Sequence, residues 1–460
     1  MKYQNKVFPK KACFVILSEI TKQPRFDRSK LDRYLDEISI QRGYFPDGID
    51  PFLEKVPTLG QWALIISKEL PVECERAVIQ FPINEVSRNV LNENLKPEVF
   101  FISCYTSMLS ICFESIEYFR NKFPSAKIIV GGPHANFMPD SFLDSRADIV
   151  WSGEIDGQLH QILKQAEGMK QSNTTQPIFM KNTSRLLTPN TLDWKLYLEY
   201  SDHENRQMPR MMISRDCIHK CSFCVPRGVG KSIRERRKSL DIFKNDIREY
   251  RSLKEDDLLH IRFTDPDFLW DAEWNLQVVE LLYELDVTWD CQTRIPNNLK
   301  SFSSLLPRIR ESGCRSIFFG IESTNQRVLK LINKNYTAKN IDKVLEACTD
   351  EGIMTLCNLL IGLPGQNKSD VINDVNWACK ALIDGRLGCA DILFLMLMPG
   401  TEVYNDPEKF KIAISSNFSW MNLEQRVQHS TDQLSTELIE RLYEEAIVML
   451  SNTYKSILSI

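Results

Sequence analysis

The sequence predicts an α/β protein with a doubly wound N-terminal domain, a partial (β/α)6 barrel and a C-terminal helical segment. Short runs rich in Val, Ile and Phe alternate with helix-like segments along most of the chain, a rhythm typical of parallel sheets covered by helices. A polar stretch at 167–204 interrupts this rhythm and is expected to be a linker between the two domains. The length of 460 residues is sufficient for two or three domains.

The first predicted domain spans residues 1–166. Its expected strands consist mainly of continuous Val, Ile and Phe runs, which predicts a parallel sheet that is buried on both faces. Ligands of such sheets bind beyond the carboxyl ends of the strands, where polar or glycine-rich turns occur at 103–106, 131–136 and 152–154. The expected strands are Ala12–Leu17, Ala77–Gln80, Val99–Ser103, Lys127–Val130 and Asp148–Trp151, and the expected helices lie near 58–69, 86–93, 113–122, 139–144 and 156–166.

The second predicted domain spans residues 205–404 and contains six strand–helix units, enough for a barrel that is open on one side. Residues 405–460 follow, and their helical periodicity from Leu434 to Leu450 predicts a helix that packs on the core. The expected barrel strands are 210–214, 258–264, 287–291, 315–320, 354–361 and 390–396, and the expected helices lie near 239–253, 272–285, 301–312, 325–332, 337–350 and 368–384.

The bulk composition is that of an ordinary globular protein. Hydrophobic residues make up 43% of the chain, charged residues 26%, and the net charge is −4, so nothing marks the whole protein as a nucleic-acid binder. No apolar run approaches the length needed to span a bilayer. The apolar stretch after the basic N-terminus is too brief for a signal-peptide core. Thirteen cysteines without such a signal predict reduced thiols in the cytoplasm.

Three cysteines follow the first expected barrel strand with the spacing C-x3-C-x2-C: Cys217, Cys221 and Cys224. Three thiolates at this pitch can hold three irons of a cubane iron–sulfur cluster, which usually has four thiolates. One iron would then remain open to a substrate or cofactor. A zinc site is the alternative, with His219 inside the triplet as a candidate fourth ligand, and three unrelated buried thiols are another.

Further strand ends carry polar or glycine-containing sequences at 264–268, 293–296, 320–323, 358–365 and 398–404. In this order after the cysteine triplet, they resemble the radical S-adenosylmethionine (radical SAM) core of the B12-associated type. The resemblance covers about 205–405. It implies a [4Fe–4S] cluster on Cys217, Cys221 and Cys224, whose open iron chelates SAM and whose electron cleaves it to a 5′-deoxyadenosyl radical.

The same resemblance implies which residues hold SAM. Arg294 could hold the SAM carboxylate or a substrate anion by a bidentate contact, and an ion pair with Asp265 or Asp267 is the structural alternative. Cys389 could donate a hydrogen atom to a substrate radical, and burial as a small hydrophobe is the alternative. The residues expected at SAM are Phe223, Gly320, Glu322, Ser323, Asn358 and Gly362.

The turns of the N-terminal domain, taken with the strands before them, resemble the cobalamin-binding (B12-binding) domain over roughly 50–165. This resemblance implies a Rossmann-like fold whose loops could hold a corrinoid. His134 lacks the Asp-x-His-x-x-Gly pattern of cobalt-ligating histidines, since Gly132 and Phe137 occupy the Asp and Gly positions. A loop histidine bonded to backbone is the alternative. The candidate corrinoid residues are Ser103, Tyr105, Thr106, Gly131, Gly132, Pro133, His134, Gly153 and Glu154.

Together the two resemblances imply a cobalamin-dependent C-methyltransferase that acts on a small metabolite or peptide and receives electrons from a flavodoxin or ferredoxin. A corrinoid-free epimerase, dehydratase or cyclase with the same domains is the main alternative. A non-catalytic zinc or redox module and a tRNA-modifying enzyme are further alternatives. The basic run 227–238 is expected to be a solvated turn with some residues paired to cofactor carboxylates, and a grip on phosphate or nucleic acid is its alternative.

Overall fold

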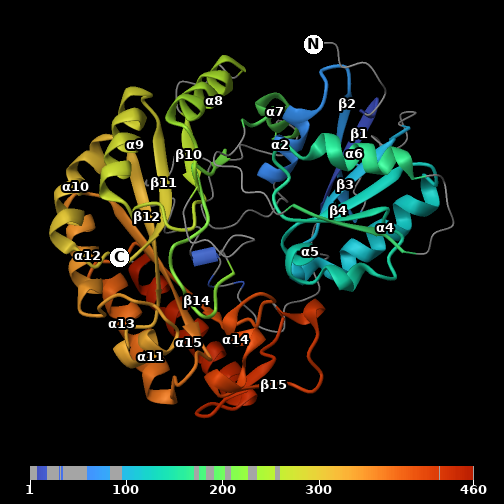
Figure 1. The fold of residues 1–460 in the computed structure, drawn as a ribbon. Helices are drawn as coiled ribbons and strands as arrows, with labels where there is room; N and C mark the ends of the chain where they lie inside the picture. Colours follow the sequence, from blue (N-terminus) through green and yellow to red (C-terminus); the bar gives the residue numbers. More distant parts are fainter. Residues whose placement is uncertain are drawn as a thin grey trace. The chain divides into compact units, whose positions relative to one another are not determined.

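The computed structural model divides the chain into two compact units (Figure 1). Unit 1 comprises Met1–Gln23, Lys55–Asn205 and Val229–Lys231, and unit 2 comprises Pro24–Glu54, Arg206–Gly228 and Ser232–Ile460. The structure describes residues 8–17, 29, 31, 33–34, 60–82, 87, 96–169, 176–182, 191–201, 209–225, 236–253, 259–423 and 425–458.

Unit 1 contains a six-stranded sheet in which every neighbouring pair is parallel, with the order β2-β1-β3-β4-β5-β6. The chain adds β2 on one side of β1 and then β3 to β6 on the other, so the direction of winding reverses at β1. In doubly wound sheets, ligands bind beyond the strand ends at such a reversal. The strands are β1 (Lys11–Leu17), β2 (Glu75–Phe81), β3 (Val99–Ser103), β4 (Lys127–Gly131), β5 (Ile149–Ser152) and β6 (Ile178–Lys181).

Aromatic side chains form part of the core between the helices and the sheet of unit 1. Phe100 of β3 and Phe119 of α4 are fully buried, and their rings stack with centroids 4.3 Å apart. Such apolar contacts fix the helix to the sheet. The described helices of this unit are α2 (Gln61–Glu69), α4 (Leu109–Lys122), α5 (Pro133–Phe137), α6 (Leu159–Gly168) and α7 (Trp194–Ser201), with 3-10 turns η1 (Thr106–Met108) and η2 (Pro139–Phe142).

The stretch 167–204 differs from the expected linker, because it contains β6 and α7 of unit 1. Strand β6 pairs in parallel with β5, and its four residues alternate between exposed and half-buried positions, as in a short edge strand. Such a strand has no continuous apolar run to reveal it. The segment expected as a helix at 139–144 forms η2, and the helix expected at 86–93 lies outside the described residues apart from residue 87.

Unit 2 contains a second six-stranded parallel sheet, with the order β14-β13-β12-β11-β10-β7. The strands lie in chain order, so each crossover advances in the same direction, as in β/α barrels. The two outer strands, β7 and β14, are the edges of this sheet. The strands are β7 (Arg210–Met211), β10 (His260–Phe263), β11 (Thr288–Arg294), β12 (Cys314–Glu322), β13 (Met354–Ile361) and β14 (Cys389–Phe394).

Helices line the outer side of these strands, with α9, α10, α12 and α13 forming the visible outer layer in Figure 1. The strand–helix rhythm predicted from the sequence is confirmed here. The helices are α8 (Leu240–Leu253), α9 (Ala272–Glu284), α10 (Leu299–Glu311), α11 (Gln326–Leu331), α12 (Asn340–Asp350), α13 (Lys368–Ile383), α14 (Glu402–Asn405) and α15 (Thr436–Leu458), with 3-10 turns η3 (Glu408–Phe410) and η4 (Trp420–Asn422). Among the residues that the structure describes, no helix is both long and apolar enough to cross a membrane.

The first expected barrel strand, 210–214, is divided in two. Only β7 joins the sheet, and β8 (Ser214–Arg215) instead pairs antiparallel with β9 (Arg236–Arg237). The buried carboxylate of Asp265 accepts hydrogen bonds from the backbone N–H groups of Ile213 and Ser214 and from the Ser214 hydroxyl. These bonds replace the sheet ladder, because a backbone N–H already bonded to a side chain cannot also continue the strand pairing.

The C-terminal region combines a hairpin with a long helix. Strands β15 (Ile412–Ile414) and β16 (His429–Thr431) pair antiparallel, and α15 then packs against α13 and β14. The hydroxyl of the fully buried Tyr454 accepts a hydrogen bond from Ala390 N at 2.6 Å and donates one to Ala390 O at 2.9 Å. This helix thereby satisfies backbone groups of an edge strand, which would otherwise need another partner.

Candidate active site

The cysteine loop directly follows β8 and is held in place from several sides. Asp216 has a positive φ of 69°, and its carboxylate forms an ion pair with Arg236 of β9 at 2.8 Å in which both side chains are buried. The backbone of Ser222 accepts a hydrogen bond from Val403 N and donates one to Ile332 O, both at 3.0 Å. Backbone contacts to two other segments therefore fix the loop before any metal is considered.

The three thiols are free and near enough to influence one another electrostatically. Desolvation, with smaller contributions from Asp267 and Cys221, raises the pKa of the Cys217 thiol to about 11. Only the thiolate is a good metal ligand. Binding of iron at this loop would therefore release protons, and this coupling of metal binding to deprotonation is general for cysteine sites.

Within the described part of the chain, no three His, Cys, Asp or Glu side chains gather as ligands of a single metal ion would. A cubane cluster does not require such a gathering, because each of its thiolates binds a different iron. The loop geometry is thus compatible with a cubane on Cys217, Cys221 and Cys224. The donor set also fits, since three soft thiolates suit iron–sulfur clusters.

Polar residues and one glycine form a row across the sheet. The strand registers pair Arg294 with Gly320, Gly320 with Asn358, and Asn358 with Asp391. Residues paired in register on adjacent parallel strands direct their side chains to the same face of the sheet. Arg294 and Asn358, which the sequence analysis singled out separately, therefore share one face with the glycine between them.

Glu322 lies at the end of β12 and is the most constrained of the predicted site residues. Its backbone has a positive φ of 65°, unusual for a residue other than glycine, and such strain concentrates at functional sites. Its Oε1 atom forms a buried ion pair with Lys334 Nζ at 2.7 Å. Burial alone would lower the pKa of Lys334, but the charge of Glu322 raises it above its ordinary value.

Lys334 was not among the residues that the sequence predicted. It follows the short helix α11 and has no pattern around it that distinguishes it from a surface lysine. Its Nζ atom lies 5.9 Å from the ring centroid of Phe223 in the cysteine loop. A Cβ atom at Gly320 would lie 2.8 Å from the same Nζ and 2.9 Å from Glu322 Oε1. Glycine at this position thus leaves room for the ion pair, which links β12 to the cysteine loop.

Two buried acceptors in this region lack a partner among the described residues: Glu322 Oε2 and Asn358 Oδ1. Buried polar atoms are nearly always paired in native proteins, so these two indicate a ligand with hydrogen-bond donors. SAM has such donors in its ammonium group, its ribose hydroxyls and its adenine amino group. The residues present therefore fit SAM beside the cysteine loop.

Two of the other expected SAM residues have protein partners instead. Ser323 is fully buried, and its hydroxyl donates to Asp374 of α13 at 2.8 Å. The N–H of Gly362 donates to Gln366 Oε1, and its carbonyl accepts a bond from His429 Nε2, both at 2.9 Å. Ser323 and the Gly362 backbone thus hold the strand ends in place through these bonds.

The guanidinium of Arg294 forms no ion pair with Asp265 or Asp267 in the described part of the structure, so the structural alternative for this residue does not hold. The Asp267 carboxylate instead accepts hydrogen bonds from Thr293 Oγ1 at 2.6 Å, His219 Nε2 at 2.8 Å and Arg294 N at 3.2 Å. Burial alone would raise the pKa of Asp267, but these bonds hold it below its usual value.

Cys389 lies where a hydrogen-atom donor to this site could not act. It is the first residue of β14, at the amino end of the strand, whereas the cysteine loop and Glu322 lie at the carboxyl ends. The side chain is 1% exposed and contacts the Tyr454 hydroxyl at 3.5 Å. The expected catalytic role is corrected accordingly, and the alternative of a buried hydrophobe describes this residue.

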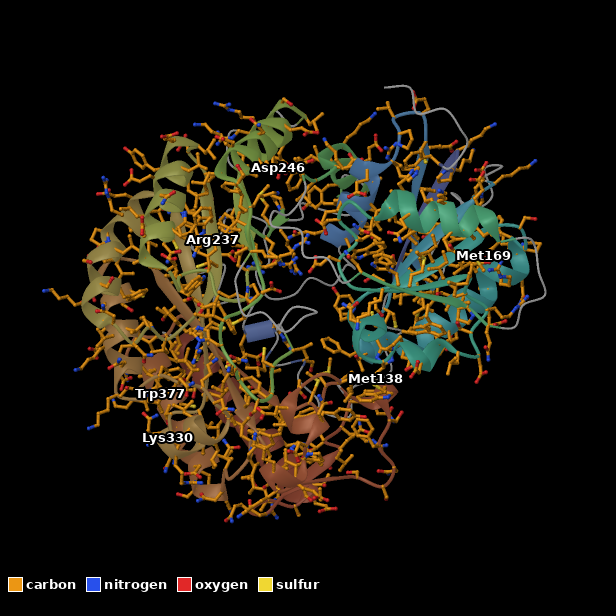
Figure 2. All side chains as sticks on the ribbon, in the orientation of Figure 1. Met138, Met169, Arg237, Asp246, Lys330 and Trp377 are labelled. Atoms are coloured by element: carbon orange, nitrogen blue, oxygen red, sulfur yellow. The ribbon has the colours of Figure 1, made fainter. Side chains whose placement is uncertain are left out.

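The described end of the basic run is paired with acids. Arg237, labelled in Figure 2, bonds to Asp271 at 2.6 Å and lies over the rings of Trp270 and Trp274. Lys238 forms a buried ion pair with Asp246 of α8, also labelled in Figure 2. Residues 226–235 lie outside the described part of the chain. Arg237 and Lys238, at the described end of the basic run, therefore stabilise unit 2 through these contacts.

The expected corrinoid turns of unit 1 meet at the carboxyl edge of its sheet. Gly132 has a φ of 98°, and a Cβ atom there would lie 2.7 Å from Cys104 N. Gly153 has a φ of 106°, and a Cβ atom there would lie 2.8 Å from Asn182 O. Both glycines are therefore required by the close approach of neighbouring strand ends, whatever ligand the edge binds.

His134 lies on α5 and is fully buried, not on an exposed loop. Its Nδ1 atom is 3.1 Å from Thr106 Oγ1 and its Nε2 atom is 3.1 Å from Ser141 Oγ. Burial lowers its pKa to about 4, so the ring is neutral at pH 7. With both nitrogens bonded to hydroxyls, His134 joins three turns of the edge and presents no free nitrogen. Tyr105, in contrast, is 50% exposed.

The family comparison identifies the domain that contains the cysteine loop. Residues 211–378 match the model of the radical SAM superfamily, and this range includes all three cysteines, Glu322 and Asn358. The matched part of the chain is therefore similar to radical SAM enzymes. This match implies SAM and a [4Fe–4S] cluster as cofactors and supports an enzymatic function for the protein.

Proteins with similar sequences include two methyltransferases by name. An uncharacterized methyltransferase of Pyrococcus horikoshii is 21% identical over 75% of this chain and 78% of its own length. The bacteriochlorophyllide d C-8(2)-methyltransferase of Chlorobaculum tepidum is 21% identical over 70% of this chain and 71% of its own.

Two solved radical SAM structures share the fold over nearly the whole chain. TsrM from Kitasatospora setae, a methyltransferase solved with tryptophan and a SAM analogue, has a TM-score of 0.59 at 14% identity and covers 89% of this chain and 79% of its own. OxsB, solved with aqua-cobalamin, has a TM-score of 0.67 at 15% identity, covering 94% of this chain and 66% of its own. At such identities the likeness shows the fold alone.

Proposed function

We propose that this radical SAM enzyme is a cobalamin-dependent C-methyltransferase. The observation that carries the radical SAM part is the pair of buried acceptors on Glu322 and Asn358 that lack a partner among the described residues, with Glu322 linked to the three-cysteine loop through Lys334. The methyltransferase part is supported by the names of two relatives and by the cobalamin in OxsB, which has a similar fold. The Rossmann-like sheet of unit 1 supplies the corresponding domain.

In this proposal Cys217, Cys221 and Cys224 hold the cluster, and the loop contacts of Ser222 keep their spacing. Glu322 accepts from the SAM ammonium or ribose, while Lys334 holds that carboxylate in one orientation. When bound, the cluster and SAM supply a radical that abstracts hydrogen, and the corrinoid supplies the methyl group. The protein contributes position, and it excludes water from buried polar groups.

For unit 1, we propose that the turns after β3, β4 and β5 border the corrinoid at the strand-end edge. Tyr105, which is 50% exposed, follows β3 at this edge and is proposed to contact the corrinoid. His134 is proposed to stabilise the edge through Thr106 and Ser141 and not to ligate cobalt. Electron supply by a flavodoxin or ferredoxin, a small-molecule or peptide substrate and a cytoplasmic location remain predictions of the sequence.

The test is anaerobic purification with hydroxocobalamin present, followed by incubation with methyl-deuterated SAM and a reductant. We expect a corrinoid absorption spectrum, deuterated methylcobalamin by mass spectrometry, and 5′-deoxyadenosine. The triple Cys→Ala variant of the loop should lose 5′-deoxyadenosine formation, and Cys379→Ala on α13 is the matched control. Protein that forms 5′-deoxyadenosine without binding any corrinoid would favour the epimerase, dehydratase or cyclase alternative.

A further inference from the structure

A cavity of about 300 Å³ lies within unit 2 beside the cysteine loop. Its wall includes Ile218 and His219 of that loop, Arg294 at the end of β11, and the first turns of α9 and α10. Gly320, Glu322 and Asn358 are not among its lining residues. The cavity is therefore separate from the acceptors that we propose for SAM, although Arg294 belongs to the same row across the sheet.

Three nitrogen donors on residues that line this cavity lack a hydrogen-bond partner in the described part of the chain: Trp270 Nε1, Asn275 Nδ2 and Arg294 Nη2. All three atoms are shielded from solvent, and Asn275 as a whole is only 1% exposed. Native proteins pair the large majority of such buried groups, so three unpaired donors around one cavity indicate a ligand with several acceptors.

The charge around the cavity favours an anion. Arg294 contributes a positive charge, and its guanidinium forms no ion pair among the described residues. The Asp267 carboxylate also lines the cavity, but it accepts its bonds from Thr293, His219 and the Arg294 backbone. The N-terminal ends of α9 and α10 border the same space; the Asp271 carboxylate already caps α9, whereas α10 begins with the neutral cap Asn298 and has no acid in its first turn. Helix N-termini carry a partial positive charge and stabilise negative groups.

The rest of the wall is apolar. The cavity is also lined by four apolar side chains, those of Leu269, Ile295, Phe302 and Leu305. Ligand pockets in proteins range from about 300 to 1,000 Å³, so this one is at the lower limit. It matches a small molecule, or one arm of a larger molecule, that has both a hydrocarbon part and a group of acceptors.

We propose that this cavity binds the carboxylate of the substrate, with Trp270, Asn275 and Arg294 as its three donors. A carboxylate supplies two oxygens with about four acceptor positions and takes a bidentate contact from a guanidinium. The hydrocarbon part of the substrate then lies against Phe302 and Leu305. The identity of the ligand as substrate rests on the proposed function, whereas binding of a carboxylate in the cavity does not.

The test compares a small carboxylate with its uncharged isostere. Isothermal titration calorimetry on the full-length, anaerobically reconstituted protein uses isovalerate, isovaleramide and inorganic phosphate as probes. We expect isovalerate to bind about tenfold or more tightly than the amide, because only the carboxylate offers charged acceptors. Equal affinity for the two, no binding of isovalerate, or tighter binding of phosphate would each overturn the proposal.

Single substitutions test which side chains donate hydrogen bonds to the bound carboxylate. Trp270→Phe and Asn275→Leu each remove one donor at similar volume, and each should weaken isovalerate binding about fivefold to tenfold. Trp274→Phe, a neighbouring tryptophan outside the cavity wall, should leave it unchanged. If Asn275→Leu fails to fold, Trp270→Phe still decides, because it keeps an aromatic ring beside Arg237. Unchanged binding in Trp270→Phe would contradict the assignment.

Affinity for SAM in the same variants separates this proposal from the proposed function. Arg294→Gln should lose isovalerate binding but keep its affinity for SAM within about twofold, because in this proposal Arg294 does not contact SAM. A tenfold weaker affinity for SAM would correspond to a lost interaction of about 1.4 kcal/mol. A parallel loss of both would show that Arg294 holds the SAM carboxylate, which overturns the substrate site. If the wild-type protein binds isovalerate but does not cleave SAM, the proposed function is contradicted and the carboxylate site is not.

Discussion

At the scale of single residues, Glu322 is the side chain on which the account of SAM binding depends. One of its oxygens is fixed by Lys334 and the other is buried without a partner among the described residues. The positive φ of Glu322 shows that the fold holds this carboxylate in place at an energetic cost. Such an energetic cost is expected where the fixed position of a side chain favours the binding of a ligand.

Replacement of Glu322 by glutamine tests this role. The variant keeps the size of the side chain and removes its charge, so we expect SAM to bind about tenfold more weakly, as the loss of one charge-assisted hydrogen bond predicts. Equilibrium dialysis with the reconstituted protein measures this affinity. Glu445→Gln, in an exposed pair with Arg441 on α15, is the control. Unaltered SAM affinity in E322Q with an intact cluster would rule out the proposed contact.

At the residue scale, the sequence allows site predictions only where the signal is local. The three cysteines, Glu322 and Asn358 stand out by their spacing or by their place after a strand. Lys334, Trp270 and Asn275 could not be found in this way, because their roles arise from tertiary contacts with segments distant in sequence. Cys389 was misjudged for the related reason that strand polarity decides which end of β14 faces the cysteine loop.

At the scale of elements, α15 stabilises unit 2 through its contact with the edge strand β14. The hydroxyl of Tyr454 is the only part of that residue which phenylalanine would lack, and it bonds both backbone groups of Ala390. Tyr454→Phe would leave these buried groups unpaired, so we expect the free energy of unfolding to fall by about 1–3 kcal/mol. Urea unfolding followed by fluorescence measures this change.

Tyr283→Phe on α9 provides the matched control, because the Tyr283 side chain is exposed and its hydroxyl is not needed for packing. We expect it to change the free energy of unfolding by less than about 0.5 kcal/mol. Equal effects of the two substitutions would contradict the role assigned to Tyr454. A change in activity of Y454F without a change in stability would likewise contradict it.

A buried histidine in the hairpin β15–β16 makes the free energy of unfolding of unit 2 depend on pH. His429 donates from Nε2 to Gly362 O, and burial lowers its pKa to about 4. In the unfolded chain the pKa of histidine is about 6.5. Between these values the unfolded state binds more protons, so the free energy of unfolding is highest above about pH 6.5 and falls as the pH is lowered toward about 4.

Replacement of His429 by glutamine should remove this contribution, which is roughly 3 kcal/mol over that range. Urea midpoints measured from pH 4.5 to pH 7.5 for wild type and H429Q report the difference between their slopes. The exposed His160, replaced by glutamine in the same way, should leave the slope of the wild type unchanged. A steeper pH dependence in H429Q than in wild type would contradict the assignment.

Element-scale prediction was best for continuous apolar strands and weakest for short polar ones. Strands Val99–Ser103 and Met354–Ile361 occur within the bounds that their apolar runs predict. Strand β6 was missed because only its pairing with β5 defines it, and the first barrel strand was divided because the Asp265 side chain takes its backbone donors. Both cases depend on partners that no local pattern contains.

At the scale of the whole molecule, the α/β class and the two parallel sheets followed from the sequence, and the family comparison confirms the radical SAM assignment. The substrate could not be predicted, since the site proposed for it combines side chains from several strand ends and helices that only the fold brings to one cavity. The residues around that cavity come from the cysteine loop, β11, α9 and α10. The same holds for the corrinoid, whose expected glycines are also required by packing.

The central claim is that three cysteines hold a cubane whose fourth iron is open to SAM. Electron paramagnetic resonance of the anaerobically reconstituted, dithionite-reduced protein with and without SAM tests it most directly. We predict the signal of a reduced [4Fe–4S] cluster that changes when SAM is added and disappears in the C217A, C221A and C224A variants. A cluster signal that SAM leaves unaltered, or protein that binds one zinc and no iron, would contradict the account.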